Sequence, residues 1–194
     1  MLLEPTSVAL KVISVFEELG IPYFIGGSLA SAIHGVVRST NDVDIVADLK
    51  PEHILPLKNA LQSEFYIDKD MIKEAIERKS CFNLIYLELM FKVDIFVAGN
   101  HPYIQEQFKR RGKETIIRNP EKIAYVSTPE DTILSKLDWF RKGGGVSDRQ
   151  WADVLGVIKL QGKRLDMDYL HDWANKLNLG DLFRKGLEEA GIGE

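Results

Sequence analysis

The chain has 194 residues, of which 45% are hydrophobic and 28% charged, and its formal net charge is −4 at pH 7. This is the composition of an ordinary globular protein, and a chain of this length buries about 70% of the surface that its unfolded form exposes, so its core needs no disulfide or structural metal. The negative net charge argues against attraction of nucleic acid to the whole surface but is compatible with a local basic patch. The one cysteine, Cys81, excludes an intrachain disulfide and is typical of a reducing cytosol.

The start of the chain indicates a helix instead of a targeting segment. Residues 1–20 carry three Glu and one Lys, and their apolar residues recur at helical spacing. A signal peptide has a basic start and a continuous apolar core, which this stretch lacks. No other stretch approaches the roughly 18 consecutive apolar residues of a membrane-spanning helix. We therefore expect a cytoplasmic protein that does not act in a membrane.

Up to about residue 126 the pattern alternates between helices and strands. Short apolar runs rich in β-branched and aromatic residues indicate strands, and periodic apolar residues between turn signals indicate helices. In chain order the pattern predicts helices over 5–20, 28–35 (capped by Ser28), 50–63, 69–80 and 102–110, and strands over 21–27, 42–49, 82–88, 91–97 and 114–118, with a hairpin near Leu89–Met90.

From Thr128 onward the pattern is helical throughout. Thr128 and Ser147 each begin a capping box, and Pro129 takes the first helical position. The glycine-rich segment 141–147 between them predicts a joint at which the helical part shifts relative to the sheet and closes over a substrate. The prediction is an α+β fold, with a mixed sheet flanked by helices over 1–126 and a C-terminal helical bundle over 127–194.

Two carboxylates stand two residues apart in the strand predicted over 42–49. Side chains alternate between the faces of a strand, so Asp42 and Asp44 point the same way, about 7 Å apart along the chain. Like charges this close repel each other unless a positive group lies between them. Mg²⁺ takes oxygen ligands and shares them with substrate phosphates, so the pair is typical of a magnesium site.

A third acid lies on the strand predicted over 91–97. Val93 and Ile95 form an apolar row, and Asp94 stands alone on the other face, where burial would cost several kcal/mol unless the charge were paired or bound to a metal. If the two strands are neighbours, the three carboxylates converge on a volume that can hold one or two metal ions. Taken singly, each acid is also explained by surface polarity.

Gly26, Gly27 and Ser28 connect a predicted strand to a predicted helix. Free backbone N–H groups at a helix N-terminus, with no Cβ in the way, form an anion site. Equally, the glycines simply make the turn and Ser28 caps the helix. Arg38 has the charge to neutralise a triphosphate, or it is a surface charge. We interpret His34 as a packed, hydrogen-bonded histidine instead of a base.

With these motifs the chain resembles the nucleotidyltransferase superfamily, which includes DNA polymerase β, the lincosamide and aminoglycoside nucleotidyltransferases and the AbiEii-type toxins. The signature of that family is Gly-[Gly/Ser] at the start of a helix, Asp-x-Asp on the following strand and a third acid on a later strand. The stretch GGSLASAIHGVVRSTNDVDIV, residues 26–46, is especially similar to the small prokaryotic members, whose pattern also contains Arg38 and Thr40.

The resemblance implies a nucleotidyltransferase-type fold and an enzyme that moves a nucleoside monophosphate from an NTP to an acceptor, with release of pyrophosphate. It implies that Mg²⁺ or Mn²⁺ is held by Asp42, Asp44 and Asp94, and that Asp94 also helps to deprotonate the acceptor hydroxyl. The residues implied in nucleotide and phosphate binding are Gly26, Gly27, Ser28, Arg38 and Thr40.

The AbiEii-like branch also has a lysine on a C-terminal helix, followed by an aspartate in the next helical segment. Lys136 and Asp153 match these positions, with Asp148 as a competing match for the aspartate. The resemblance therefore adds Lys136 to the nucleotide-binding residues and Asp153 as a further C-terminal residue. A plain amphipathic helix with a lysine at its flank explains Lys136 equally well.

Two functions of different classes remain open at this point. The first is the metal-dependent nucleotidyltransferase; the alternative is a catalytically silent binding module of the same fold, such as the partner protein of a toxin in a toxin–antitoxin pair. The acceptor is also open, among RNA (tRNA included), a protein and a small molecule. The densest basic cluster, residues 108–113, would contact an RNA backbone or would be a solvated helix end.

Overall fold

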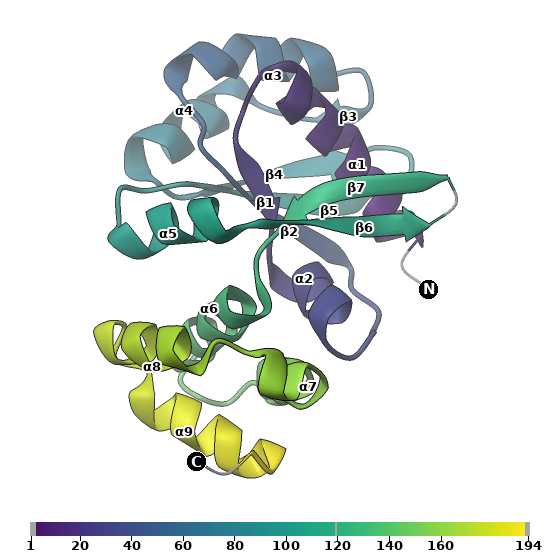
Figure 1. Ribbon diagram of the computed structural model, residues 1–194. Helices are drawn as coiled ribbons and strands as arrows, with labels where there is room; N and C mark the ends of the chain where they lie inside the picture. The colour runs from purple at the N-terminus through teal and green to yellow at the C-terminus, as the bar shows by residue number, and fades with distance from the viewer. Residues whose placement is uncertain (1–2, 119, 193–194) are drawn as a thin grey trace. The chain divides into compact units, whose positions relative to one another are not determined.

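The computed structural model describes residues 3–118 and 120–192 (Figure 1). Contacts between its Cα atoms divide the chain into two compact units. The sheet unit consists of Met1–Gly26 and Ser39–Val126, and the helical unit consists of Gly27–Arg38 and Ser127–Glu194. The boundaries 1–126 and 127–194 expected from the sequence stay a prediction, since the short segment Gly27–Arg38 groups with the C-terminal helices.

The sheet unit contains a seven-stranded mixed sheet in the order β3-β4-β5-β2-β1-β7-β6. The pairs β1–β7 and β2–β5 are parallel, and the other neighbours are antiparallel. The strands are β1 Tyr23–Ile25, β2 Asp42–Ala47, β3 Phe65–Tyr66, β4 Cys81–Tyr86, β5 Phe91–Val97, β6 Gly112–Arg118 and β7 Glu121–Val126. The helices of this unit are α1 Leu3–Glu18, the 3₁₀ turn η1 Pro51–His53, α3 Ile54–Leu61, α4 Lys69–Arg78 and α5 Pro102–Arg110.

The two faces of the central strands carry different side chains. In β2, Val43 and Ile45 are fully buried, whereas Asp42 and Asp44 alternate with them and point to the opposite face. The apolar face lies toward α1, where Phe16 packs against Tyr23 with ring centroids 6.1 Å apart, and Figure 1 shows α1, α3 and α4 on one side of the sheet.

The face that carries the aspartates is covered differently. Phe24 of β1 pairs with Val46 of β2, two residues after Asp44, so Phe24 projects to the aspartate face. Its ring packs edge-on against Phe108 of α5, with centroids 5.1 Å apart. Within the sheet unit, α5 therefore covers the end of this face that lies beyond Asp44.

The helical unit comprises α2 Gly27–His34, α6 Pro129–Lys142, α7 Asp148–Gln161, η2 Gly162–Arg164, α8 Met167–Lys176 and α9 Gly180–Ala190. Helix α2 packs against both α6 and α7. A Cβ on Gly35, just after α2, would lie 2.9 Å from the backbone nitrogen of Val157, so only glycine allows the chain to approach α7 this closely. The expected caps are present: the Thr128 side chain accepts a hydrogen bond from the N–H of Asp131, and that of Ser147 from Gln150.

Most of the predicted elements are confirmed, including the hairpin, whose turn places Met90 at a φ of +51°. Strands β3 and β7 were not predicted: β3 has two residues, and β7 begins with the polar residues Glu121 and Lys122. The glycine-rich segment was misread as a joint between sheet and helices. It connects α6 to α7, and both helices lie in the helical unit. No helix of residues 3–118 and 120–192 is long and apolar enough to cross a membrane.

Candidate active site

Three aspartates share one face of the sheet. Strands β2 and β5 are parallel neighbours, and Asp44 is the register partner of Asp94. Side chains at paired positions project to the same face, and Asp42, two residues before Asp44, projects there as well. The register of the sheet thus brings together acidic residues that are 50 positions apart in the sequence.

The carboxylate of Asp94 is buried and is held on both oxygens. Asn83, its register partner on β4, donates to Oδ1, and the ammonium of Lys92 lies 2.6 Å from Oδ2. The residue is 7% exposed, and a carboxylate at such a position requires paired charge and hydrogen bonds. The hydrogen bond to Asp94 raises the pKa of Lys92, so the lysine stays charged.

Asp42 and Asp44 have their own local contacts. The hydroxyl of Thr40 lies 2.9 Å from Oδ1 of Asp42, where it orients the carboxylate. The N–H of Gly26 donates to the carbonyl of Asp44 at 2.9 Å. The expectation that the glycine turn offers free N–H groups is therefore wrong for Gly26, because the sheet uses that donor.

Cys81 lies on the aspartate face, two residues before Asn83. Burial of the thiol, and then the negative charges of Asp94 and Asp44, raise its pKa to about 12. The thiolate is the nucleophilic and metal-binding form of cysteine, and the raised pKa disfavours this form at neutral pH.

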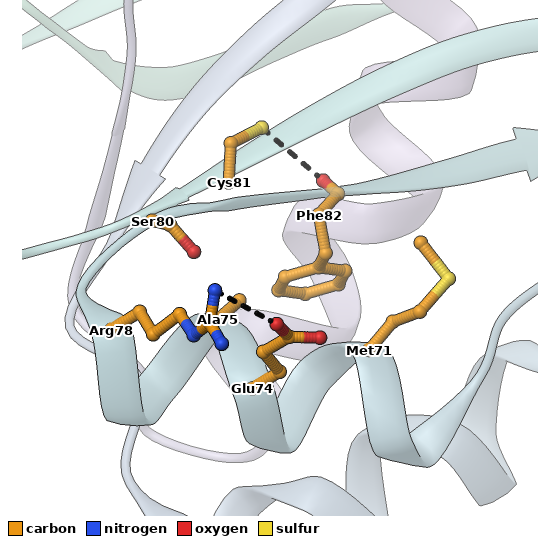
Figure 2. A pocket seen from close by; sticks show the side chains of 7 residues that line it. All are labelled: Met71, Glu74, Ala75, Arg78, Ser80, Cys81 and Phe82. Atoms are coloured by element: carbon orange, nitrogen blue, oxygen red, sulfur yellow. Dashed lines mark hydrogen bonds and ion pairs between the residues drawn. The ribbon is translucent and has the colours of Figure 1, made fainter.

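A hollow of about 290 Å³ lies between α4 and the start of β4, lined by residues that include Met71, Arg78, Ser80 and Cys81 (Figure 2). Glu74 and Arg78 form an exposed ion pair of 3.2 Å at its rim. None of the site residues predicted from the sequence lines this hollow, so we do not assign it to the reaction.

The carboxylate set fits a divalent cation in its chemistry, because Mg²⁺ and Mn²⁺ prefer carboxylate oxygens. In the described part of the chain, however, no group of three His, Cys, Asp or Glu side chains is spaced to hold a metal ion. Lys92 supplies the positive charge that offsets Asp94 in this arrangement. Asn83 and Lys92 were not predicted as site residues, although Lys92, two residues before Asp94 on a strand, necessarily shares its face.

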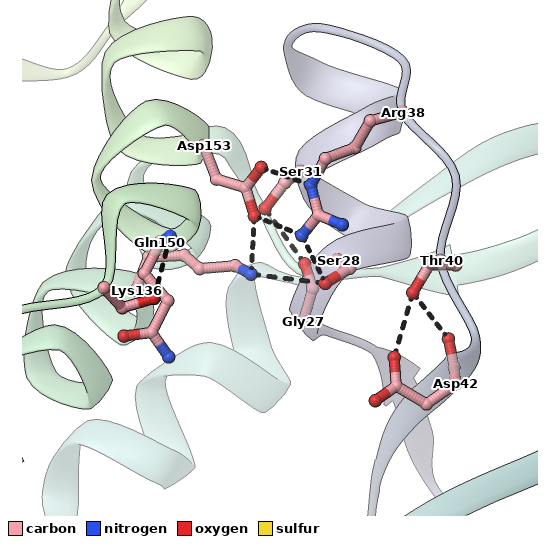
Figure 3. Close-up of polar contacts among 10 residues, drawn as sticks. Gly27, Ser28, Ser31, Arg38, Thr40, Asp42, Lys136, Gln150 and Asp153 are labelled. Carbon is pink, nitrogen blue, oxygen red and sulfur yellow. Dashed lines mark hydrogen bonds and ion pairs between the residues drawn. The ribbon is translucent and has the colours of Figure 1, made fainter. Parts of the chain in front are cut away.

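A second cluster of candidate residues lies in the helical unit (Figure 3). Arg38 binds Asp153 with two hydrogen bonds of 2.8 Å, from Nε to Oδ1 and from Nη2 to Oδ2. Lys136 of α6 donates to Oδ2 of Asp153 at 2.8 Å. Both cations also reach the hydroxyl of Ser28, Arg38 at 2.8 Å and Lys136 at 3.5 Å.

The cluster is buried and carries one more positive than negative charge. The side chains of Asp153 and Lys136 are 5% and 10% exposed. Burial alone would raise the pKa of Asp153, but the hydrogen bonds from Arg38 and Lys136 lower it below its ordinary value. Arg38 and Lys136 converge on the hydroxyl of Ser28, and charged donors of this kind bind phosphate oxygens well.

Two sequence interpretations change with this geometry. Helix α2 begins at Gly27, so Ser28 lies in its first turn and not at the cap position, and its hydroxyl binds Arg38 instead. His34 is 6% exposed and donates from Nε2 to the carbonyl of Ser127 at 2.7 Å. This agrees with the interpretation of His34 as a packed, hydrogen-bonded residue.

No protein-family model matches the chain, and no curated protein matches its sequence. Solved structures do match its fold. The antibiotic-resistance factor ANT(2'')-Ia aligns over 95% of this chain and 94% of its own, with a TM-score of 0.58 and 13% identity. The lincosamide antibiotic adenylyltransferase LnuA, bound to lincomycin, aligns over 79% of this chain and 95% of its own, with a TM-score of 0.52 and 13% identity.

A third match is an antigenic nucleotidyltransferase-like protein from Paracoccidioides brasiliensis, which aligns over 96% of this chain and 91% of its own, with a TM-score of 0.55 and 18% identity. The chain has the nucleotidyltransferase fold. The resemblance carried by residues 26–46 and Asp94 thus predicted the fold correctly. The sequence identities to these solved structures are too low to assign an activity.

The site residues predicted from the sequence fall into two groups, one in each unit of the chain. Asp42, Asp44 and Asp94 lie in the sheet unit, together with Gly26 and Thr40. Gly27, Ser28, Arg38, Lys136 and Asp153 lie in the helical unit. Of the two aspartates that compete for the C-terminal position, Asp153 contacts the cluster, whereas Asp148 is the first residue of α7.

Proposed function

We propose that the protein is a metal-dependent nucleotidyltransferase, which moves a nucleoside monophosphate from an NTP to an acceptor and releases pyrophosphate. One observation carries this proposal: in a chain of nucleotidyltransferase fold, Asp44 and Asp94 are register partners on parallel strands, and Asp42 shares their face. The small prokaryotic AbiEii-like proteins are the branch we propose, on the pattern of residues 26–46 together with Lys136 and Asp153.

In this proposal Asp42, Asp44 and Asp94 hold Mg²⁺ or Mn²⁺. The bound metal supplies positive charge that stabilises the attacking and leaving oxygens. Asp94 also accepts the proton of the acceptor hydroxyl, and the acceptor oxygen bonds to the α-phosphorus as pyrophosphate leaves. Thr40 and Asn83, which hydrogen-bond to the carboxylates of Asp42 and Asp94, would orient them for this role.

The helical unit contributes to triphosphate binding in the same proposal. Arg38 and Lys136 both contact the Ser28 hydroxyl, and a phosphate oxygen at this point is within reach of two cations. Asp153 holds the two cations in place and offsets one of their charges. Gly27, the first residue of α2, has a φ of +55° and lets the backbone approach a phosphate without a Cβ.

The second candidate is a catalytically silent binding module, such as a component of a toxin–antitoxin pair. The contact of Lys92 with Asp94 favours this candidate, because the ammonium of Lys92 neutralises the carboxylate that a metal ion would need as a ligand. The two candidates differ in one measurable property, since only an active enzyme binds an NTP in a manner that depends on a divalent metal and on the aspartates.

The test is isothermal titration of ATP, GTP, CTP and UTP with and without Mg²⁺. The wild-type protein is compared with the double variant Asp42→Ala/Asp44→Ala and with a control, Asp70→Ala/Asp168→Ala, which removes two exposed aspartates at helix starts. We expect Mg²⁺-dependent binding in the wild type and the control, and its loss in the first variant with an unchanged melting temperature. Equal binding by all three proteins would refute the assignment.

A further inference from the structure

Lys92 completes a block of four charged side chains on the aspartate face. In the parallel pairing of β2 with β5, Lys92 is the register partner of Asp42, and Asp94 is the register partner of Asp44. Paired positions on neighbouring strands lie about 5 Å apart, and positions two residues apart along one strand lie about 7 Å apart. Lys92 is therefore the fourth corner of a block whose other three corners are the aspartates.

The ammonium of Lys92 binds one of the three carboxylates and is attracted by all of them. It lies 2.6 Å from Oδ2 of Asp94. The hydrogen bond to Asp94, followed by the negative charges of Asp94, Asp42 and Asp44, raises the pKa of Lys92 although partial burial lowers it. The lysine thus stays positively charged at neutral pH, within the field of every acid of the proposed metal site.

Both oxygens of Asp94 already bind groups of the chain. Asn83 donates to Oδ1, and Lys92 pairs with Oδ2. The side chain of Asp94 is only 10% exposed, so a new ligand of this carboxylate has to compete with one of these contacts. The side chain of Lys92 is 46% exposed, and its ammonium can be hydrated as soon as it leaves Asp94. Lys92 is therefore the contact that can be exchanged.

The charge of the block explains why an exchangeable cation is useful at this position. With Lys92 the three aspartates and one lysine carry a net charge of −2, and without it the net charge is −3. Carboxylates at this spacing repel one another unless a positive group lies between them. Lys92 therefore stabilises the folded sheet, and it also weakens the attraction of the block for a cation from solution.

We propose that Lys92 is a positioning residue that exchanges partners during substrate binding, releasing Asp94 to the metal and passing its ammonium to a phosphate oxygen of the NTP. This inference deepens the proposed function and rests on it, because the metal is the one assigned to Asp42, Asp44 and Asp94. A phosphate oxygen is a strong acceptor for an ammonium donor, so the NTP offers Lys92 a partner in place of the carboxylate. Metal binding is then favoured when the nucleotide arrives with it.

A purely structural ion pair is the competing explanation for the contact of Lys92 with Asp94. Such a pair would stabilise the fold and leave the affinities for metal and nucleotide unchanged. The exchange instead gives Lys92 two effects of opposite sign, since the lysine weakens binding of the metal alone and strengthens binding of the nucleotide. No structural role produces this reversal.

The first measurement is binding of Mn²⁺ without nucleotide, followed by the electron paramagnetic resonance signal of the free ion. The second is calorimetric titration of the α,β-methylene analogues of ATP, GTP, CTP and UTP at a Mn²⁺ concentration that saturates each protein. The test variant is Lys92→Met, and Lys92→Arg keeps the charge. Lys73→Met is the control, because it removes a lysine of α4 whose side chain is 64% exposed.

We expect Lys92→Met to bind Mn²⁺ alone up to about fivefold more tightly than the wild type, the factor that a partly exposed ion pair contributes. With Mn²⁺ saturating, the same variant should bind the nucleotide analogue about tenfold more weakly, because it lacks one hydrogen bond to a charged group. Lys73→Met should match the wild type in both measurements. Lys92→Arg should not bind Mn²⁺ more tightly than the wild type.

The double variant Asp42→Ala/Asp44→Ala separates failure of this inference from failure of the proposed function. If Mn²⁺ binding is lost in the double variant but Lys92→Met binds Mn²⁺ no more tightly than the wild type, or binds the analogue equally well, the exchange is refuted and the proposed function stands. If Mn²⁺ binding survives the loss of both aspartates, or if the wild type and Lys92→Met bind neither Mn²⁺ nor any analogue, both are refuted.

Discussion

The guanidinium of Arg38 binds the carboxylate of Asp153 through two hydrogen bonds of 2.8 Å, across 115 residues of sequence. Arg38 follows α2 and Asp153 lies in the middle of α7, so this pair joins the early segment of the helical unit to its C-terminal helices. Lys136 adds a second cation on Oδ2. The contact therefore serves the stability of the helical unit as well as the proposed phosphate binding.

Replacement of Asp153 by asparagine should destabilise the protein. The substitution leaves the partly exposed Arg38 and the buried Lys136 without a counter-charge, and removal of one partner from a buried ion pair costs about 3 kcal/mol or more. Urea unfolding followed by circular dichroism measures the change. Asp148→Asn is the matched control on the same helix, and its expected cost is below about 1 kcal/mol. Similar losses in both variants would show that the pair contributes nothing specific.

The same pair should make stability depend on pH in a defined direction. Because the hydrogen bonds from Arg38 and Lys136 lower the pKa of Asp153 in the folded state, its contribution is fully present above the ordinary value of 3.8 and is lost as pH falls through the lowered one. The difference in urea midpoint between the wild type and Asp153→Asn should therefore be constant near neutral pH and shrink below about pH 4. A difference that grows on acidification would contradict this.

The acidic face shows what the sequence does and does not predict. The alternation of Asp42, Val43 and Asp44 predicts a shared face correctly, and Val93, Asp94 and Ile95 do the same for a second strand. The sequence analysis could only assume that these two strands are neighbours. The order of strands in a sheet depends on contacts between residues that are distant in the sequence. The contact of Asn83 with Asp94 depends on the register of a third strand, which no local pattern specifies.

The helical segment after the first strand was harder to predict than the acids. Its small residues indicate a helix, and α2 is indeed a helix, but nothing local shows that it packs against α6 and α7. The partners of Arg38 and Ser28 were therefore beyond sequence reasoning, and only the resemblance pointed to Lys136 and Asp153. Strand β7 carried a usable signal, the apolar and aromatic run Ile123–Val126, next to a polar start that masks it.

Removal of the Lys92 side chain should strengthen Mg²⁺ binding if the aspartates hold the metal. Lys92 neutralises Asp94 in the structure, and a metal ion at these carboxylates competes with it for the same charge. The lysine side chain is 46% exposed, so the pair is worth at most about 1 kcal/mol, or a roughly fivefold change in affinity. Calorimetric titration of Lys92→Ala with Mg²⁺, against Lys73→Ala as control, checks the prediction. Weaker binding by Lys92→Ala would place the metal elsewhere.

Replacement of Gly35 by alanine should lower the stability of the protein, because the added methyl group overpacks the contact between α2 and α7. The added Cβ would lie 2.9 Å from both the carbonyl oxygen of Ser31 and the backbone nitrogen of Val157, and neither backbone atom can move without shifting a helix. Such overpacking typically costs about 1–3 kcal/mol. Gly99→Ala is the control, because its Cβ would meet only the Cβ of Lys79, at 3.9 Å. Thermal unfolding of the two variants should show a lower melting temperature for Gly35→Ala alone; equal temperatures would mean that the segment after α2 can move away from α7 at little cost.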